Sequence, residues 1–103
     1  MEKDFKMELR RGYDADFVNL SGTIDYDAGT SLEELMEIVN RPKIRIDFSK
    51  VGRINSMGIA FLLRCFKKLR DDKGAEISLT GLNSMHTMLF KMTGVFLLAN
   101  PEN

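Results

Sequence analysis

The sequence has little of the chemistry that disulfides, metal centres and membrane spans require. Its 103 residues include one cysteine, one histidine and no tryptophan. Cys65 alone cannot form an internal disulfide, and no Cys and His cluster exists from which a zinc site could be built. No apolar run approaches the roughly 20 residues of a membrane helix, and the first residues are too charged for a signal peptide. We therefore expect a cytoplasmic protein with no metal, no cofactor and no membrane insertion.

An excess of charge of either sign is also missing. Lysine and arginine together number 15, and aspartate and glutamate also number 15. The net positive field that drives sequence-independent binding to a phosphate backbone is therefore missing, and nucleic acid is not an expected partner. A chain of 103 residues with 44% hydrophobic residues fits one compact domain, residues 1–103, with its core over about residues 5–99.

Alternation of apolar and polar residues predicts the strands. In the clearest example, Ile44, Ile46 and Phe48 alternate with charged residues, which is typical of a strand with one buried face. A glycine-containing turn at residues 12–14 predicts a hairpin between the first two strands. The predicted strands are Phe5–Arg11, Ala15–Leu20, Lys43–Phe48 and Ala75–Thr80, and Val95–Ala99 is compatible with a short last strand.

Apolar residues at helical spacing predict three helices. The first contains Leu32 to Val39, with a capping box formed by Ser31 and Glu34. The second begins at Ser56 and buries a stripe of Ile59, Leu62, Leu63, Phe66 and Leu69, which leaves Cys65 on its outer half. The third begins near Asn83 or Ser84, ends at Gly94 and carries Met85, Met88, Leu89 and Met92 as core filling.

The order of these elements predicts the fold class. Strand–helix–strand crossovers following a hairpin imply a mixed sheet, and the alternating strands leave one sheet face polar. We expect an α/β domain whose helices pack mainly on one face of a mixed β-sheet.

Three short motifs indicate a family. The first motif in the chain is Leu20-Ser-Gly-Thr-Ile-Asp25. The second consists of a strand that ends in Asp47-Phe48 and a following helix that begins with Asn55-Ser-Met-Gly-Ile59. The third is Leu89-Phe-Lys-Met-Thr-Gly-Val-Phe96. In this order the motifs resemble those of the STAS family, specifically the bacterial anti-sigma factor antagonists. The likeness covers roughly Phe5 to Ala99. Two positions depart from the family pattern. This chain has Asn55 where the family has an acidic residue, and Met57 where the family has a second serine or threonine.

The resemblance implies a phosphorylation switch at Ser56. In the family, the matching serine is phosphorylated by a partner that is both anti-sigma factor and serine kinase, of the GHKL type, and a phosphatase reverses the reaction. A serine at a helix N-terminus lies beside unsatisfied N–H groups and the positive end of the helix dipole, so a phosphate there is tolerated by the fold. We therefore expect a non-enzymatic partner-switching regulator.

A helical wheel predicts the surface that binds the partner. Residues Met57, Ala60, Phe61 and Arg64 fall on a face beside Ser56 and away from the buried stripe. Together with Asn55 and with Asp25 at the rim, they form the predicted docking patch. Asp25 and Asp27 lack a third ligand for a metal ion, so a turn or rim role is favoured for them.

Other interpretations stay open. Ser56 is also a favoured residue for a helix N-cap, with no role in signalling. The domain could be a constitutive, unphosphorylated binding subunit or scaffold of a larger complex, which Asn55 and Met57 favour. A small enzyme or nucleotide-binding protein is disfavoured, because no phosphate-binding loop, dinucleotide-binding turn or nucleophile–base pairing is visible.

Overall fold

The computed structural model describes residues 4–102, so residues 1–3 and 103 of the predicted domain lie outside the described residues. The strands are β1 (Lys6–Arg11), β2 (Ala15–Ile24), β3 (Lys43–Ile54), β4 (Glu76–Thr80) and β5 (Asn100–Pro101). The α-helices are α1 (Gly29–Ile38), α2 (Ser56–Lys73) and α3 (Ser84–Thr93), and two short 3-10 helices are η1 (Tyr26–Ala28) and η2 (Val95–Leu97). Within this range no helix is long and apolar enough to span a membrane.

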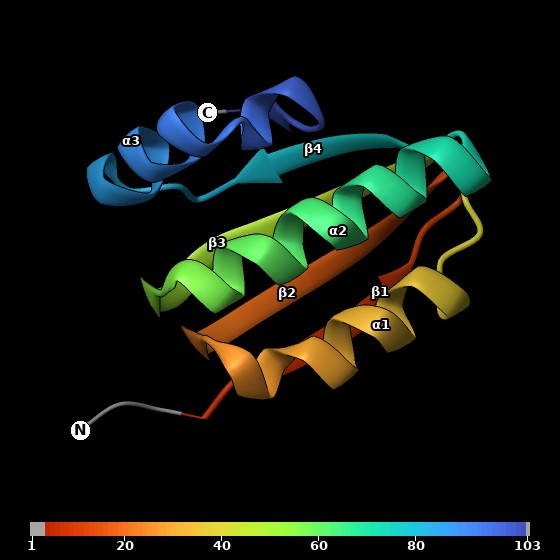
Figure 1. Cartoon of the computed structure of the whole chain (residues 1–103). Helices are drawn as coiled ribbons and strands as arrows, with labels where there is room; N and C mark the ends of the chain where they lie inside the picture. Colours follow the sequence, from red (N-terminus) through yellow and green to blue (C-terminus); the bar gives the residue numbers. More distant parts are fainter. Residues whose placement is uncertain (1–3, 103) are drawn as a thin grey trace.

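The five strands form one mixed sheet in the order β1-β2-β3-β4-β5. β1 is antiparallel to β2, and the other neighbouring pairs are parallel. Figure 1 shows α1 and α2 side by side across the sheet, with α3 next to β4 on the far side of α2 from α1. The predicted hairpin and the predicted mixed sheet are therefore confirmed.

The helices lie on one face of the sheet, as predicted. Ile44, Ile46 and Phe48 of β3 are buried on this face. Phe90 of α3 contacts Phe48 there, with ring centroids 5.4 Å apart in an edge-on arrangement. On the other face Lys43 and Arg45 are exposed and Asp47 is half-buried. Phe17 lies there between the guanidinium groups of Arg10 and Arg45, which are 5.0 and 6.0 Å from its ring centroid.

Two strands run further than the sequence predicts. β2 continues to Ile24, and β3 continues through the predicted loop to Ile54, with shifts in the pairing register between the two strands. The polar residues in these stretches hide the alternation because each register shift changes which face a side chain occupies. At the C-terminus the short-strand interpretation of Val95–Ala99 is wrong, since Val95–Leu97 form η2 and the last strand is Asn100–Pro101.

The predicted capping box at Ser31 and Glu34 is also wrong. η1 leads directly into α1, so α1 begins at Gly29 and Ser31 lies inside its first turn. The side-chain cap is at the start of η1, where the carboxylate Oδ1 of Asp25 accepts a hydrogen bond from the backbone N–H of Asp27 at 3.0 Å. This confirms the turn role favoured for Asp25.

Helix α3 faces the core with a different side from the one predicted. Met85, Met88 and Met92 are 72%, 64% and 77% exposed, whereas His86 and Phe90 are buried. The imidazole Nε2 of His86 lies 2.8 Å from the carbonyl oxygen of Gly52, and this contact fixes α3 to β3. Because a carbonyl only accepts, Nε2 is the donor.

Cys65 is buried in the core, not on the outer half of α2. Its Sγ lies 3.6 Å from the carbonyl oxygen of Leu32, because α1 covers the flank of α2 that the wheel leaves to solvent. Burial raises the pKa of the Cys65 thiol to about 12.

The start of α2 packs tightly on the end of β2. A Cβ atom at Gly58 would lie 2.1 Å from the backbone carbonyl oxygen of Ile24. The same oxygen accepts a hydrogen bond from the backbone N–H of Asn55 at 3.1 Å. Only glycine allows α2 to begin this close to the strand.

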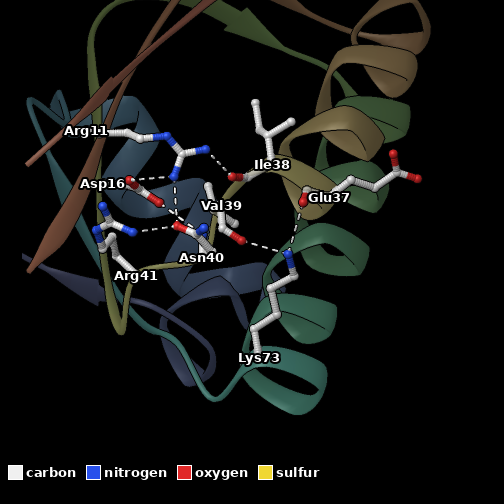
Figure 2. A network of polar contacts seen from close by, with 8 residues as sticks. All are labelled: Arg11, Asp16, Glu37, Ile38, Val39, Asn40, Arg41 and Lys73. Carbon is white, nitrogen blue, oxygen red and sulfur yellow. Dashed lines mark hydrogen bonds and ion pairs between the residues drawn. The ribbon is translucent and has the colours of Figure 1, made fainter.

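A network of polar contacts closes the C-terminal end of α1 (Figure 2). Arg11 donates from Nη2 to the carbonyl oxygen of Ile38 and from Nη1 to Oδ1 of Asn40, both at 2.7 Å. Asp16 is fully buried; its Oδ2 accepts from the Asn40 N–H at 3.1 Å, and its Oδ1 lies 3.8 Å from Arg11 Nη1. Lys73 reaches over from the last turn of α2 to the carbonyl oxygen of Val39 at 2.6 Å.

Arg11→Ala is expected to lower the free energy of unfolding by about 3 kcal/mol, because it leaves the buried Asp16 carboxylate without its cation. Urea denaturation measures the loss. Lys67→Ala is the matched control, since the Lys67–Asp71 pair is exposed and about 0.5 kcal/mol or less is expected there. Adding Asp16→Asn to Arg11→Ala should recover part of the loss, and equal losses in Arg11→Ala and Lys67→Ala would contradict the assignment.

Gly58→Ala is expected to destabilise the protein by about 3 kcal/mol, because its methyl group would overlap backbone that cannot move aside freely. Gly52→Ala is the matched control, since a Cβ at Gly52 meets nothing within 4 Å. Thermal or urea unfolding of both variants makes the comparison. A Gly58→Ala variant as stable as Gly52→Ala would show that α2 can shift away from β2.

The pKa of Cys65 predicts a stability loss at alkaline pH. The folded pKa lies above the unfolded value of about 8.5, so the stabilisation is present below that value and is lost as the pH rises toward 12. Between pH ~9 and ~11 the free energy of unfolding should fall by up to about 1.4 kcal/mol per pH unit more in the wild type than in Cys65→Ala. Equal pH slopes in urea denaturation of the two proteins would show that the thiol ionises without cost.

Candidate functional site

The candidate site lies at the edge of the sheet where β2 and β3 end. Ile24 and Ile54 are register partners in these parallel strands, and Asp25 and Asn55 are the residues that follow them. α2 begins at once with Ser56. The structure thus brings Asp25, Asn55 and Ser56 together, although 30 positions separate the first two.

Asn55 is the N-cap of α2. Its side-chain Oδ1 accepts a hydrogen bond from the backbone N–H of Gly58 at 2.9 Å. Ser56 is the first residue of the helix and is exposed. The interpretation of Ser56 as the N-cap is therefore wrong, because the preceding asparagine already fulfils that role with a side chain as suitable as serine's.

The predicted docking patch on α2 is exposed at most of its positions. Met57 is 44% exposed, and Ala60 and Arg64 also face solvent. Phe61 is different, because it is half-buried and packs against the core. A Cβ atom at Gly29 would lie 2.9 Å from the Phe61 ring, so the ring rests on the start of α1 and supports the patch from beneath.

A surface depression of about 410 Å³ lies beside Met57. It is lined by Tyr26, Asp27, Gly29, Thr30, Glu33, Met57 and Phe61. The Tyr26 ring is 70% exposed, and its centroid is 6.1 Å from that of Phe61. The sequence reasoning missed Tyr26, and the only signal for it was an aromatic residue directly after the motif that ends at Asp25. The lining combines the apolar side chains of Met57 and Phe61 with the acidic side chains of Asp27 and Glu33.

Arg64 lies further along α2, at a second depression of about 340 Å³ between α1 and α2. Glu33 and Glu37 line it from α1, and Arg64 and Lys68 line it from α2. Glu33 also lines the first depression, so the two are neighbours along the helix pair. Arg64 thus extends the patch away from Ser56.

This arrangement suits protein binding and modification more than catalysis. No group of three or more His, Cys, Asp or Glu able to hold a metal ion occurs among residues 4–102. The N–H groups of the first turn of α2 and the helix dipole favour an anionic group on Ser56. The neighbouring Met57 and Tyr26 side chains offer apolar area that a partner protein can cover.

Comparison with solved structures shows the same fold. An anti-sigma factor antagonist from Mycobacterium paratuberculosis superposes with a TM-score of 0.77 at 21% identity, covering 95% of this chain and 85% of that one. A sulfate transporter family protein from Wolinella succinogenes gives 0.74 at 11%, covering 84% and 71%. The Bacillus cell fate determinant SpoIIAA in its phosphorylated form gives 0.66 at 13%, covering 97% and 92%. At these identities the likeness establishes the fold.

Sequence comparison supplies the family. A search among curated proteins found no match. The family model described as "Mlab, STAS domain" matches residues 7–96, which is most of the chain and includes all three motifs. The protein therefore belongs to the STAS domain family.

Proposed function

We propose that this protein is a partner-switching regulator of the anti-sigma factor antagonist type, controlled by phosphorylation of Ser56. In the unphosphorylated state the patch around Ser56 binds a protein that is both kinase and anti-sigma factor, of the GHKL type. Phosphorylation releases this partner, and a phosphatase restores binding. The protein acts in the cytoplasm by binding and carries out no catalysis itself.

The observation that carries this proposal is that Asn55, and not Ser56, is the N-cap of α2. Asn55 caps α2, so the fold does not need the Ser56 hydroxyl for that purpose. Ser56 is exposed next to Met57, at the border of the depression that Tyr26 and Phe61 line. A modification there changes the docking patch and leaves the cap intact.

Electrostatics explain how the switch works. A phosphate adds a charge of about −1.5 to −2, which the N-terminus of α2 can accommodate at little cost to the fold. The depression beside the patch already carries Asp27 and Glu33. A phosphate therefore makes an acidic region more acidic, and it must be desolvated when a partner covers Met57. SpoIIAA, which shares this fold, has been solved in unphosphorylated and phosphorylated forms.

A second candidate is a constitutive binding subunit of a larger complex, in which Ser56 stays unmodified. The family model that matches this chain is described as "Mlab, STAS domain", and a sulfate transporter family protein shares the fold. The same patch of Asn55, Ser56, Met57, Ala60, Phe61, Arg64 and Asp25 would serve in both cases. The two candidates differ only in whether Ser56 is phosphorylated and whether this changes binding.

Phosphopeptide mass spectrometry of protein isolated from its own host, with bound partners recovered in the same pull-down, tests the switch. Phosphate on Ser56 is expected, together with a kinase that Ser56→Ala retains and Ser56→Asp loses. In a binding titration with that kinase, Ser56→Asp should weaken affinity at least tenfold, which corresponds to about 1.4 kcal/mol. Met57→Asp should weaken it similarly, because it places a charge on the apolar part of the patch.

Ser84→Asp is the matched control. Ser84 is exposed and is the first residue of α3, and the preceding Asn83 caps that helix through a hydrogen bond from the His86 N–H at 2.8 Å. The same charge in the same helical position should leave kinase binding unchanged. A Ser56 that is never phosphorylated, with the same partners held by Ser56→Ala and Ser56→Asp, would identify the protein as a constitutive binder.

A further inference from the structure

Helix α3 presents an apolar stripe to solvent. Met85, Met88 and Met92 lie within an arc of roughly 60° on the helix, opposite the buried His86 and Phe90. From Gly81 to Asn100 there is no acidic residue, and the only lysine or arginine is Lys91. The exposed face of α3 is therefore nearly uncharged, in a protein where charged residues make up 29% of the chain.

The size of this surface exceeds that of isolated exposed apolar residues. The three methionines are each more than three-fifths exposed, as is Leu97 in the following η2. Together these four residues expose an area on the order of 500 Å², which is within the range of the largest apolar patch on a typical monomer, and such patches are often functional. Two such patches brought together reach about 1,000 Å², the lower bound for a specific interface.

The spacing of the methionines fits pairing of α3 with a second copy of itself. Met88 lies near the middle of the stripe, with Met85 about 4.5 Å before it and Met92 about 6 Å after it along the helix axis. In an antiparallel pair about a two-fold axis at Met88, Met85 of one copy faces Met92 of the other. A two-fold interface needs such a self-complementary pattern.

The shape of the surface agrees with antiparallel pairing. A depression of about 470 Å³ flanks the N-terminal half of α3 and is lined by Leu82, Asn83, Ser84, Thr87, Met88 and Lys91. The exposed Met92 lies near the C-terminal end of α3, and the exposed Leu97 follows in η2. In an antiparallel pair, the C-terminal end of α3 of one copy, which carries Met92, lies at this depression of the other copy. The two-fold symmetry repeats the contact with the copies exchanged.

We propose that α3 is the interface of a two-fold symmetric homodimer, in which the methionine stripes of two copies pack antiparallel. The interface needs no ion pair, which agrees with the near absence of charge on this surface, and the flexible methionine side chains can adapt to one another. α3 lies on the far side of α2 from α1 (Figure 1). The docking patch lies at the start of α2 and at Asp25, beside the depression that η1 and α1 residues also line. The dimer therefore leaves the patch around Ser56 free, and the inference does not depend on the proposed function.

Sedimentation equilibrium of the full chain across micromolar to millimolar concentration tests the dimer. We expect a reversible monomer–dimer equilibrium in the wild type and a dissociation constant at least 100-fold higher for Met88→Glu. Because Met88 is exposed, the melting temperature of the Met88→Glu monomer should match that of the wild-type monomer at low concentration. Met57→Glu, a methionine outside the stripe, is the control and should dimerise normally. A monomeric wild type at millimolar concentration, or an undiminished dimer of Met88→Glu, would overturn the proposal.

Disulfide trapping tests the antiparallel register, with all variants made in a Cys65→Ala background. Under mild oxidation Met88→Cys should cross-link to its own copy, and a mixture of Met85→Cys and Met92→Cys should give mainly the mixed disulfide. Cross-linking of Met85→Cys chiefly to itself would overturn the antiparallel arrangement. Retention of the kinase by Met88→Glu would show that dimerisation and partner binding are separate, so the failure of one proposal is distinguishable from that of the other.

Discussion

The contact between α2 and the last carbonyl group of β2 determines the geometry of the site. The Ile24 oxygen accepts from the Asn55 N–H and lies where a side chain at Gly58 would begin. α2 can therefore start directly at the sheet edge, with no connecting loop between β3 and its N-cap. Because both strands and the helix meet at this point, Asp25, Asn55 and Ser56 are held by backbone contacts, and the exposed side chains contribute little to that support.

The opposite end of the molecule is held by charge. The last carbonyl groups of α1 accept hydrogen bonds from Arg11 and Lys73, and Asp16 is buried beneath them. Cations are favoured at this end of a helix, where the dipole is negative. The α1–α2 pair is thus fixed at its far end by polar contacts, and near Ser56 by Phe61 resting on Gly29. The exposed side chains of Met57 and Tyr26 are therefore not needed to hold the core together.

Sequence patterns predicted the parts of the fold that depend on local periodicity. Ile44, Ile46 and Phe48 mark a strand with one buried face, and the three motifs indicated the family and the position of Ser56. The rotation of α3 could not be predicted, because methionines and the His86–Phe90 pair both occur at helical spacing. The face of α3 that is buried is determined by contacts with the Gly52 carbonyl group and the Phe48 ring, which are distant from α3 in sequence. Likewise, only the packing of η1 against α2 reveals Tyr26 as part of the site.

The chain uses the same tripeptide, Asn-Ser-Met, to open both α2 and α3. In each helix the asparagine caps the N-terminus, the serine is the exposed first residue and the methionine is exposed. Under the proposed switch, a kinase that reads only the residues flanking its target would meet two equivalent serines here. It would have to discriminate between them through surfaces distant in sequence, such as the η1 and α1 residues beside Ser56, so short peptides copied from either helix start would be poorer substrates than the folded domain.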